Sequence, residues 1–181
     1  MRLATGAAMK RVVSTEVGSA HGTLIIYSVP RPVTTHVEWN LSAILGHPLA
    51  LNWRVQSLDP GAMKSSVNWS GSKSTAQELA STLRGWHYVT FEIYESSTNG
   101  SDGAVYMCTP ELGLFAGTVG PHGDIMINEN QISRLIDSNR PSSAIFEELE
   151  RCLGRPWDAV LESYRRAEFE GGENGFARLS V

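Results

Sequence analysis

Hydrophobic and polar residues alternate with two different periods along the first half of the chain. The segment TLIIYSV at 23–29 is a continuous apolar run typical of a buried strand, and Pro30 ends it. A helical period follows, with a T-x-x-E capping box at Thr35 and Glu38 and a stop at Gly46. The apolar face of this predicted helix consists of Val37, Leu41, Ile44 and Leu45.

Two further strands and a second helix are predicted next. Residues 50–57 and 63–70 each alternate between apolar and polar positions, which is typical of strands with one buried face. A helix is predicted from Ser74 or Thr75 up to Gly85. Its apolar face consists of Ala76, Leu79, Ala80 and Leu83.

A third alternating segment, at 87–95, completes the order β-α-β-β-α-β. Its inward residues are Val89, Phe91 and Ile93. Its other face presents Tyr88 and Tyr94, and exposed aromatic rings on a sheet indicate a surface that something covers. We therefore predict a ferredoxin-like unit over residues 22–95, with its open face covered by the C-terminal half of the chain or by a second copy.

The second half of the chain predicts a short antiparallel β-meander followed by helices. After a polar linker at 96–103 come the strand segments AVYMCT, LFAGTV and DIMIN. Three groups of apolar residues then recur at helical spacing: Ile132, Leu135 and Ile136; Ile145, Leu149, Cys152 and Leu153; and Trp157, Val160, Leu161 and Tyr164. The predicted fold class is α+β, with the meander and helices of residues 104–166 packed on the ferredoxin-like unit. Residues 1–21 are predicted to be a disordered N-terminal extension and residues 167–181 a tail.

Charge argues against nucleic acid as a partner. The formal net charge is −4, but residues 1–95 hold 8 basic and 6 acidic groups (+2), whereas residues 96–181 hold 7 basic and 13 acidic groups (−6). An acidic half repels a phosphate backbone. The third predicted strand, at 63–70, also lacks the aromatic pair of an RNA-recognition module, which shares the same element order.

Composition predicts a cytoplasmic protein of one domain. Its 181 residues are 41% hydrophobic, which is ordinary for a globular domain. The longest aliphatic or aromatic run, LIIY, falls far short of the roughly 20 residues that span a bilayer. The N-terminal stretch lacks the apolar region of a secretory signal. Cys108 and Cys152 lie in apolar contexts, which indicates free thiols in a reducing compartment.

The segment WSGSKSTAQELA at 69–80 is the most ligand-like part of the sequence. Gly71, Lys73, Ser74 and Thr75 form a candidate anion site, because a helix N-terminus offers free N–H groups beside a lysine. The chain does not match the phosphate-binding pattern G-x-x-x-x-G-K-[ST], since Val67 stands where its first glycine should be. The alternative is that Ser74 or Thr75 only caps the helix and Lys73 is solvated.

The turn GPHGD offers a candidate acid–base pair in His122 and Asp124. The alternative is a plain surface turn, because proline, glycine and aspartate all favour turns. The glycines between 111 and 130 precede a predicted strand and not a helix, so we interpret them as parts of a hairpin and not as a phosphate loop.

A candidate partner surface combines Tyr88 and Tyr94 with Arg155 and Trp157, because aromatic residues and arginine are enriched at binding hot spots. For Arg155 and Trp157, the alternative is a helix–helix corner in which a glycine ends one helix and a proline begins the next.

Four strings, YSVPRPVTTHVEW, LRGWHYVTFE, TPELGLFAGTVGPHGDIMINE and LGRPWD, resemble a family when they are taken together. This is an actinobacterial family of uncharacterised proteins, the domain-of-unknown-function family 3145, and the resemblance covers roughly residues 22 to 165. It implies a cytoplasmic actinobacterial protein and supplies no catalytic residues.

No motif in the sequence assigns a catalytic residue, metal or cofactor. The histidines and cysteines lack zinc-site spacing, and no nucleophile elbow occurs. We expect a non-enzymatic binding or regulatory protein for a small ligand or a protein partner, with a homodimer as one possible form. The alternatives are a small enzyme built around His122 and Asp124, and an accessory protein of fatty-acid synthesis. The acidic C-terminal half argues against the last alternative, because acyl carriers are acidic too.

Overall fold

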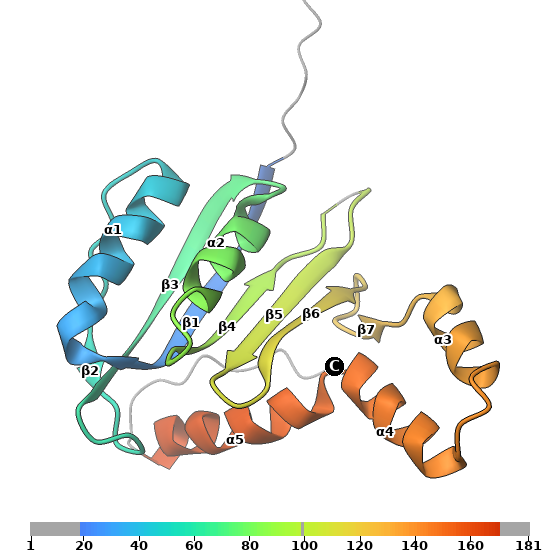
Figure 1. The fold of residues 1–181 in the computed structure, drawn as a ribbon. Coiled ribbons are helices and arrows are strands. Elements are labelled where there is room, and N and C mark those ends of the chain that lie inside the picture. The colour runs from blue at the N-terminus through green and yellow to red at the C-terminus, as the bar shows by residue number, and fades with distance from the viewer. Residues whose placement is uncertain (1–18, 99, 171–181) are drawn as a thin grey trace, which may run out of the picture.

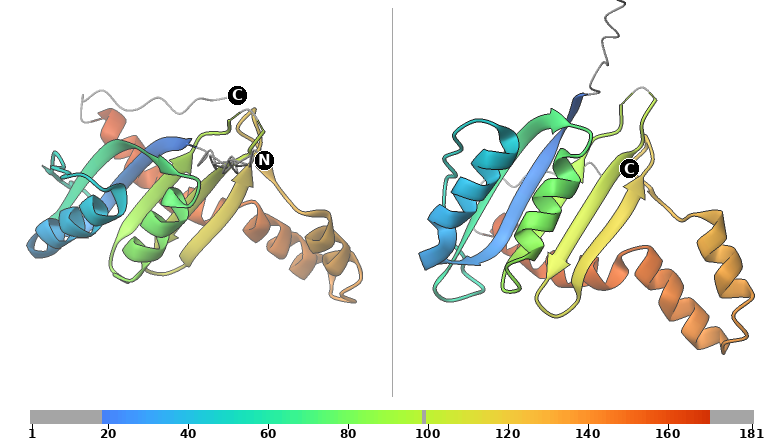
Figure 2. Two further views of the ribbon diagram at one scale, coloured as in Figure 1. Left: turned by 90° about the horizontal axis from the view of Figure 1, so that it is seen from above. Right: turned by 45° about the horizontal axis from the view of Figure 1, so that its top comes forward.

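The computed structural model describes residues 19–98 and 100–170. These residues form one antiparallel sheet of seven strands, in the order β2-β3-β1-β4-β5-β6-β7. Helices pack on both faces of the sheet (Figures 1 and 2). The predicted α+β class is therefore confirmed.

Strand β1 (Ser19–Pro30) lies at the centre of the first half, between β3 (Ala62–Ser72) and β4 (Thr90–Glu95). Helices cover both faces of this strand, which explains its continuous apolar run. Three residues of the predicted N-terminal extension, Ser19 to His21, belong to β1. Residues 1–18 of that extension lie outside the described residues.

Helices α1 (Thr34–Leu45) and α2 (Thr75–Arg84) cover one face of the sheet. The predicted apolar face of α2 is confirmed, because Ala76, Leu79, Ala80 and Leu83 are all buried. The predicted capping box is wrong. Val33, the last residue of the 3-10 turn η1 (Arg31–Val33), is the N-cap of α1. The Glu38 Oε1 atom instead accepts hydrogen bonds from Leu51 N (2.8 Å) and Trp53 Nε1 (3.0 Å). The Glu38 carboxylate therefore binds the loop after α1 and not the N-terminus of the helix.

The strand predicted at 50–57 is much shorter in the structure. Only β2 (Arg54–Val55) pairs with β3. Leu51 is buried as predicted, but the Val55 side chain is 70% exposed. The buried Gln56 side chain donates to Tyr27 O at 2.6 Å, so the chain is tied to β1 immediately after β2.

The predicted meander is confirmed as β5 (Gly103–Thr109), β6 (Gly113–Val119) and β7 (Ile125–Met126). Three helices follow, α3 (Glu129–Ile136), α4 (Ser142–Cys152) and α5 (Arg155–Glu170). Helix α5 includes residues 167–170 of the predicted tail, and residues 171–181 lie outside the described residues.

Helix α5 packs on the face of the sheet opposite α1 and α2 (Figure 2). The buried core of this face consists of Tyr27, Val105, Met107, Phe115, Val119, Trp157 and Leu161. Helices α3 and α4 project away from the sheet on the side of β6 (Figure 1). We call residues 129–152 the arm.

Candidate functional site

The arm owes its shape to residues at its helix ends. Asn128 caps α3, and its side chain accepts a hydrogen bond from Asn130 N at 2.8 Å. Pro141 precedes α4 in extended conformation. Gly154 has φ 71° between α4 and α5, a left-handed conformation that favours glycine. Local sequence therefore determines where each helix begins and ends.

Three large apolar side chains of the arm are solvent-exposed. In α3 only Leu135 is buried, and α4 buries no residue. The exposed fractions are 39% for Ile132, 71% for Ile136 and 59% for Phe146. The predicted helix with Ile132, Leu135 and Ile136 on one face is present, but only Leu135 is buried, because α3 packs on α4 and not on the sheet. The predicted stripe of α4 is half-buried, at Ile145, Leu149, Cys152 and Leu153.

The arm meets the body of the protein at Trp157. The Trp157 indole is 6% exposed and packs against Phe115 in a tilted arrangement with ring centroids 5.3 Å apart. Its Nε1 donates to Gly113 O at 2.8 Å. Arg155 is exposed and pairs with Glu150 at 3.3 Å. The structure thus has the helix–helix corner that was the alternative reading, and it leaves Trp157 unavailable as a contact surface.

A half-buried charge network fastens α5 to the sheet. Arg165 Nη2 lies 3.0 Å from both carboxylate oxygens of Glu92, and Nη1 lies 2.7 Å from Asp158 Oδ1. The Tyr27 hydroxyl donates to the same Glu92 at 2.9 Å. Burial lowers the pKa of Arg165, but the attraction of Glu92 outweighs it, and the pKa is raised above its ordinary value. These groups hold the helix in one orientation.

A second polar contact fastens α5 at Tyr164, the residue before Arg165. The Tyr164 hydroxyl donates to Asp59 Oδ2 at 2.8 Å, and the Tyr164 ring lies 5.7 Å from that of Tyr27. Burial and the bond to Asp59 raise the pKa of Tyr164 to about 12. Sequence reasoning missed this network because its partners lie up to 138 residues apart.

The candidate anion site lies at the N-terminus of α2, where the Ser74 side chain makes no capping hydrogen bond to the backbone. Ser74 is the N-cap residue of α2, and its hydroxyl donates to Glu78 Oε1 at 2.6 Å. Thr75 is buried, and a side chain at Gly71 would collide with its Oγ1 atom. Lys73 is exposed. The carboxylate of Glu78 therefore takes the place that an anion would need beside Ser74.

A buried acid near this turn was not expected from the sequence. Glu95 ends β4 with its side chain buried, and it forms no hydrogen bond or ion pair with any described residue. Burial raises the pKa of Glu95, and the charges of Lys73 and His21 offset this only in part. Among the described side chains, the fully buried polar atom without a partner is Trp69 Nε1 and not an oxygen of Glu95. The sequence pattern could have indicated this burial, because Glu95 follows Phe91 and Ile93 at every second position of the strand and so lies on the same inward face.

The structure places His122 and Asp124 at an exposed turn between β6 and β7. Gly120 N donates to Asp124 O at 2.9 Å, and Gly123 N donates to Gly120 O at 3.0 Å. Gly123 has φ 91°. These backbone features account for the glycines and for the hairpin, and neither exposed side chain makes a hydrogen bond to a described residue.

The two tyrosines of the candidate partner surface do not share a face. Strand β4 begins at Thr90, so Tyr88 precedes the alternation and packs half-buried against the core beneath α1 and α2. Tyr94 lies on the opposite face of the sheet and is 37% exposed. The prediction of a shared open face is therefore wrong for Tyr88.

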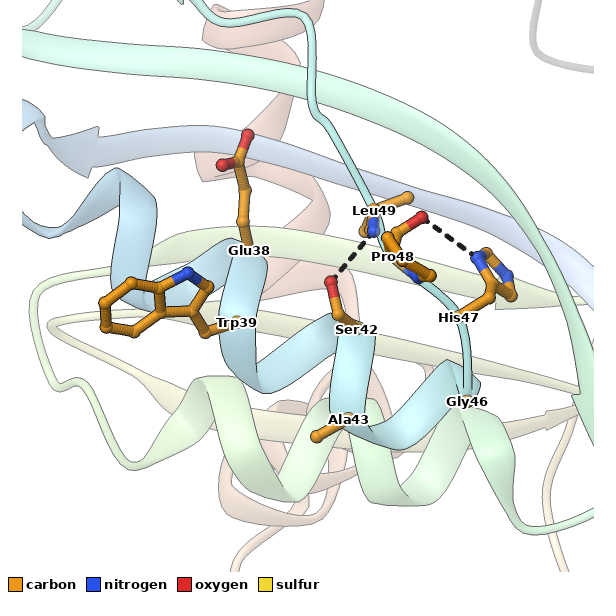
Figure 3. A pocket seen from close by; sticks show the side chains of 8 residues that line it. All are labelled: Glu38, Trp39, Ser42, Ala43, Gly46, His47, Pro48 and Leu49. Carbon is orange, nitrogen blue, oxygen red and sulfur yellow. Dashed lines mark hydrogen bonds between the residues drawn. The ribbon is translucent and has the colours of Figure 1, made fainter.

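A surface hollow of about 620 Å³ lies between α1 and the loop that follows it (Figure 3). Glu38, Ser42 and His47 line it together with the 65%-exposed Trp39. Ser42 Oγ accepts from Leu49 N at 2.9 Å, and His47 Nδ1 lies 3.2 Å from Pro48 O. Glu38 also accepts a hydrogen bond from this loop, at Leu51 N. The polar groups that line the hollow therefore stabilise the turn after α1.

Within residues 19–98 and 100–170, no group of three or more histidine, cysteine, aspartate or glutamate side chains could hold a metal ion. The helices of the described residues are all too short or too polar to cross a bilayer.

A family described as "Protein of unknown function (DUF3145)" matches residues 23–175. The chain belongs to this family. The matched range includes α5, the whole arm and all of the sheet except the first four residues of β1, so the arm is part of the DUF3145 domain and not an appendage to it. No curated protein and no solved structure matches the chain.

Proposed function

We propose that this DUF3145 protein is a non-enzymatic binding protein that engages a protein partner through the arm. The observation that carries the proposal is the exposure of Ile132, Ile136 and Phe146. They lie on two helices in which only Leu135 is buried. Exposed apolar side chains gathered on one projecting element are typical of an interaction surface. Ile132 and Ile136 lie at i and i+4, so they present one continuous face of α3.

Two of the other candidate sites support this choice because their polar side chains already have structural roles. The Ser74 hydroxyl donates to Glu78, and the Glu38 carboxylate holds the loop after α1. At the third site only the backbone of Asp124 takes part in the turn. Catalysis needs a group that is positioned but free to react. His122 is exposed without a described neighbour to orient it, so no observation favours the enzyme alternative.

We also infer a ferredoxin-like arrangement for residues 22–95 and a cytoplasmic location. The interleaved strand order β2-β3-β1-β4, with all neighbours antiparallel, supports the first inference. Cys108 and Cys152 are free thiols, and this supports a reducing compartment.

The test is capture of partners from a lysate of the cells that naturally produce the protein. The triple variant Ile132→Ser, Ile136→Ser, Phe146→Ser removes the exposed apolar groups of the arm. We expect at least one protein to bind the unchanged chain and to be captured about tenfold less by the variant, a loss of about 1.4 kcal/mol in binding. The purified partner should then reproduce that difference in isothermal titration calorimetry.

A matched control carries Val55→Ser, Leu58→Ser and Met126→Ser, whose side chains are 70%, 45% and 43% exposed. This control should bind as the unchanged chain does, and circular dichroism should show that both triple variants are folded. Equal capture by the arm variant and the unchanged chain would show that the arm is not the binding surface.

A further inference from the structure

The outer edge of β6 lacks a neighbouring strand along most of its length. Strand β6 pairs with β5 from Gly113 to Val119, but it pairs with β7 only at Thr118 and Val119. After Met126 the chain leaves the sheet for α3 (Figure 1). Among the described residues, no strand therefore pairs with the outer edge of β6 between residues 113 and 117.

Backbone alternation identifies the groups that face this edge. In an antiparallel ladder, successive residues direct their N–H and C=O groups to opposite sides. Gly120 N donates to Asp124 O at 2.9 Å, on the side of β7. By alternation, Thr118, Ala116 and Leu114 direct their backbone groups to the same side. Thr118 reaches β7, so the N–H and C=O groups of Leu114 and Ala116 stay unpaired at the edge.

The edge also lacks the features that keep strand edges from pairing. No charged residue and no proline occurs between Leu112 and Gly120. Edge strands usually carry lysine, proline or a bulge, which prevents another strand from adding to them. Ala116 is exposed, so its backbone is accessible from solvent. An unprotected edge of this kind favours the addition of a further strand.

The arrangement of the edge favours a second copy of the same chain. A two-fold axis at Phe115 would place Leu114 of one copy opposite Ala116 of the other, and the reverse. Both residues face the edge, so each pair would exchange two hydrogen bonds, about four in all. Each large leucine would meet a small alanine, and the uncharged stretch would meet itself without like-charge repulsion.

We propose that β6 pairs antiparallel with β6 of a second copy, which joins the two sheets into one. Both copies use the same strand in a two-fold arrangement, so the association closes at two copies. This proposal goes beyond the proposed function, because it uses the sheet edge and not the apolar side chains of the arm.

The first test measures self-association by sedimentation equilibrium. Ala116→Pro removes one edge-facing N–H, while residues 113, 115 and 117 keep their bonds to β5. We expect the unchanged chain to form a dimer that dissociates on dilution, and Ala116→Pro to weaken the dimer about tenfold or more. The matched control Ala116→Val keeps the N–H and should dimerise. The triple arm variant should dimerise too, which separates this result from failure of the proposed function.

The second test follows amide hydrogen exchange in the unchanged chain as its concentration rises. The amides of Leu114 and Ala116 should become about tenfold slower to exchange when the dimer forms. Those of Phe115 and Gly117 already bond to β5 and should not change. This measurement decides the question even if Ala116→Pro does not fold.

Three outcomes would overturn the proposal. One is a chain that stays monomeric up to roughly 1 mM. Another is a dimer that survives unchanged in folded Ala116→Pro. The third is a dimer in which the amides of Leu114 and Ala116 exchange as fast as they do in the monomer.

Discussion

Helices α4 and α5 follow one another with only two residues between them, yet they differ in almost every physical respect. Helix α5 buries Trp157 and Leu161 against the sheet, whereas α4 buries no residue. Both have apolar residues at helical spacing in the sequence. The comparison shows that an amphipathic pattern indicates a helix with an apolar face, but not what covers that face.

The two helices also differ in how their charges are used. Arg165 of α5 is 13% exposed and pairs with Glu92 of the sheet. The charged pair at the end of α4, Glu150 with Arg155, is 36% and 63% exposed. Removing one partner of a buried ion pair strongly destabilises the fold, because the other charge is left without its partner in a low dielectric. An exposed ion pair contributes little to the free energy of unfolding. Helix α5 is therefore part of the folded core, and α4 presents its surface to solvent.

The largest expected effect compares two aromatic truncations. Trp157→Ala removes a buried ring and a hydrogen bond to Gly113, and we expect it to lower the free energy of unfolding by about 4 kcal/mol. Phe146→Ala, at 59% exposure on α4, should change it by less than about 0.5 kcal/mol. Urea titration followed by circular dichroism measures both. Equal losses would mean that the arm is packed as tightly as α5.

The second prediction compares neighbouring arginines of α5. Arg165→Met leaves Glu92 half-buried without its cation, so we expect a loss of about 2–3 kcal/mol in the free energy of unfolding. Arg166, 73% exposed and 3.1 Å from Glu162, is the matched control. Arg166→Met should cost less than about 0.5 kcal/mol. Similar costs in urea titration would contradict the role assigned to the Arg165 network.

The smallest expected effect concerns Glu95 of β4 and is compared with Glu92 of the same strand, which pairs with Arg165 of α5. The folded pKa of Glu95 is raised by burial, so its contribution to stability is complete below the ordinary pKa of 4.5 and is lost as pH rises through the folded value. Glu95→Gln should therefore raise Tm at pH 7 by about 1–3 °C and leave it unchanged at roughly pH 4.

Glu92→Gln serves as the matched substitution on the same strand and should lower Tm at pH 7, because Arg165 loses its anion. Differential scanning calorimetry at the two pH values measures both substitutions. A Glu95→Gln variant that is less stable at pH 7 would show that Glu95 has a partner outside the described residues.

Local patterns predicted most elements of the fold. The alternation of 63–70 and the apolar period of α2 led to correct elements, because each buries its apolar face in the same core. The prediction failed at 50–57, where the alternating run forms only a two-residue strand. There Glu38 accepts the Leu51 N–H, a backbone group that a longer strand would have needed, and the Gln56 side chain is bonded to Tyr27 O of β1.

The candidate sites were harder to predict than the fold. The GSKST turn reads as an anion site until Glu78 is seen to accept the Ser74 hydrogen bond. Trp157 reads as a surface hot spot until Gly113, 44 residues earlier, is seen to accept its N–H. In both cases the deciding partner is recognised only from distances in space.

The sequence by itself determined the α+β class, the order of the elements, the caps at Asn128 and Gly154, and the uncharged stretch that became β6. These features depend on residues within a few positions of one another, where backbone geometry and periodicity act. Only the tertiary structure decided that α5 covers the sheet while the arm does not, and that one edge of β6 stays unpaired. Both depend on which surfaces meet across long separations, and the free energy of burial is gained only when those surfaces come together.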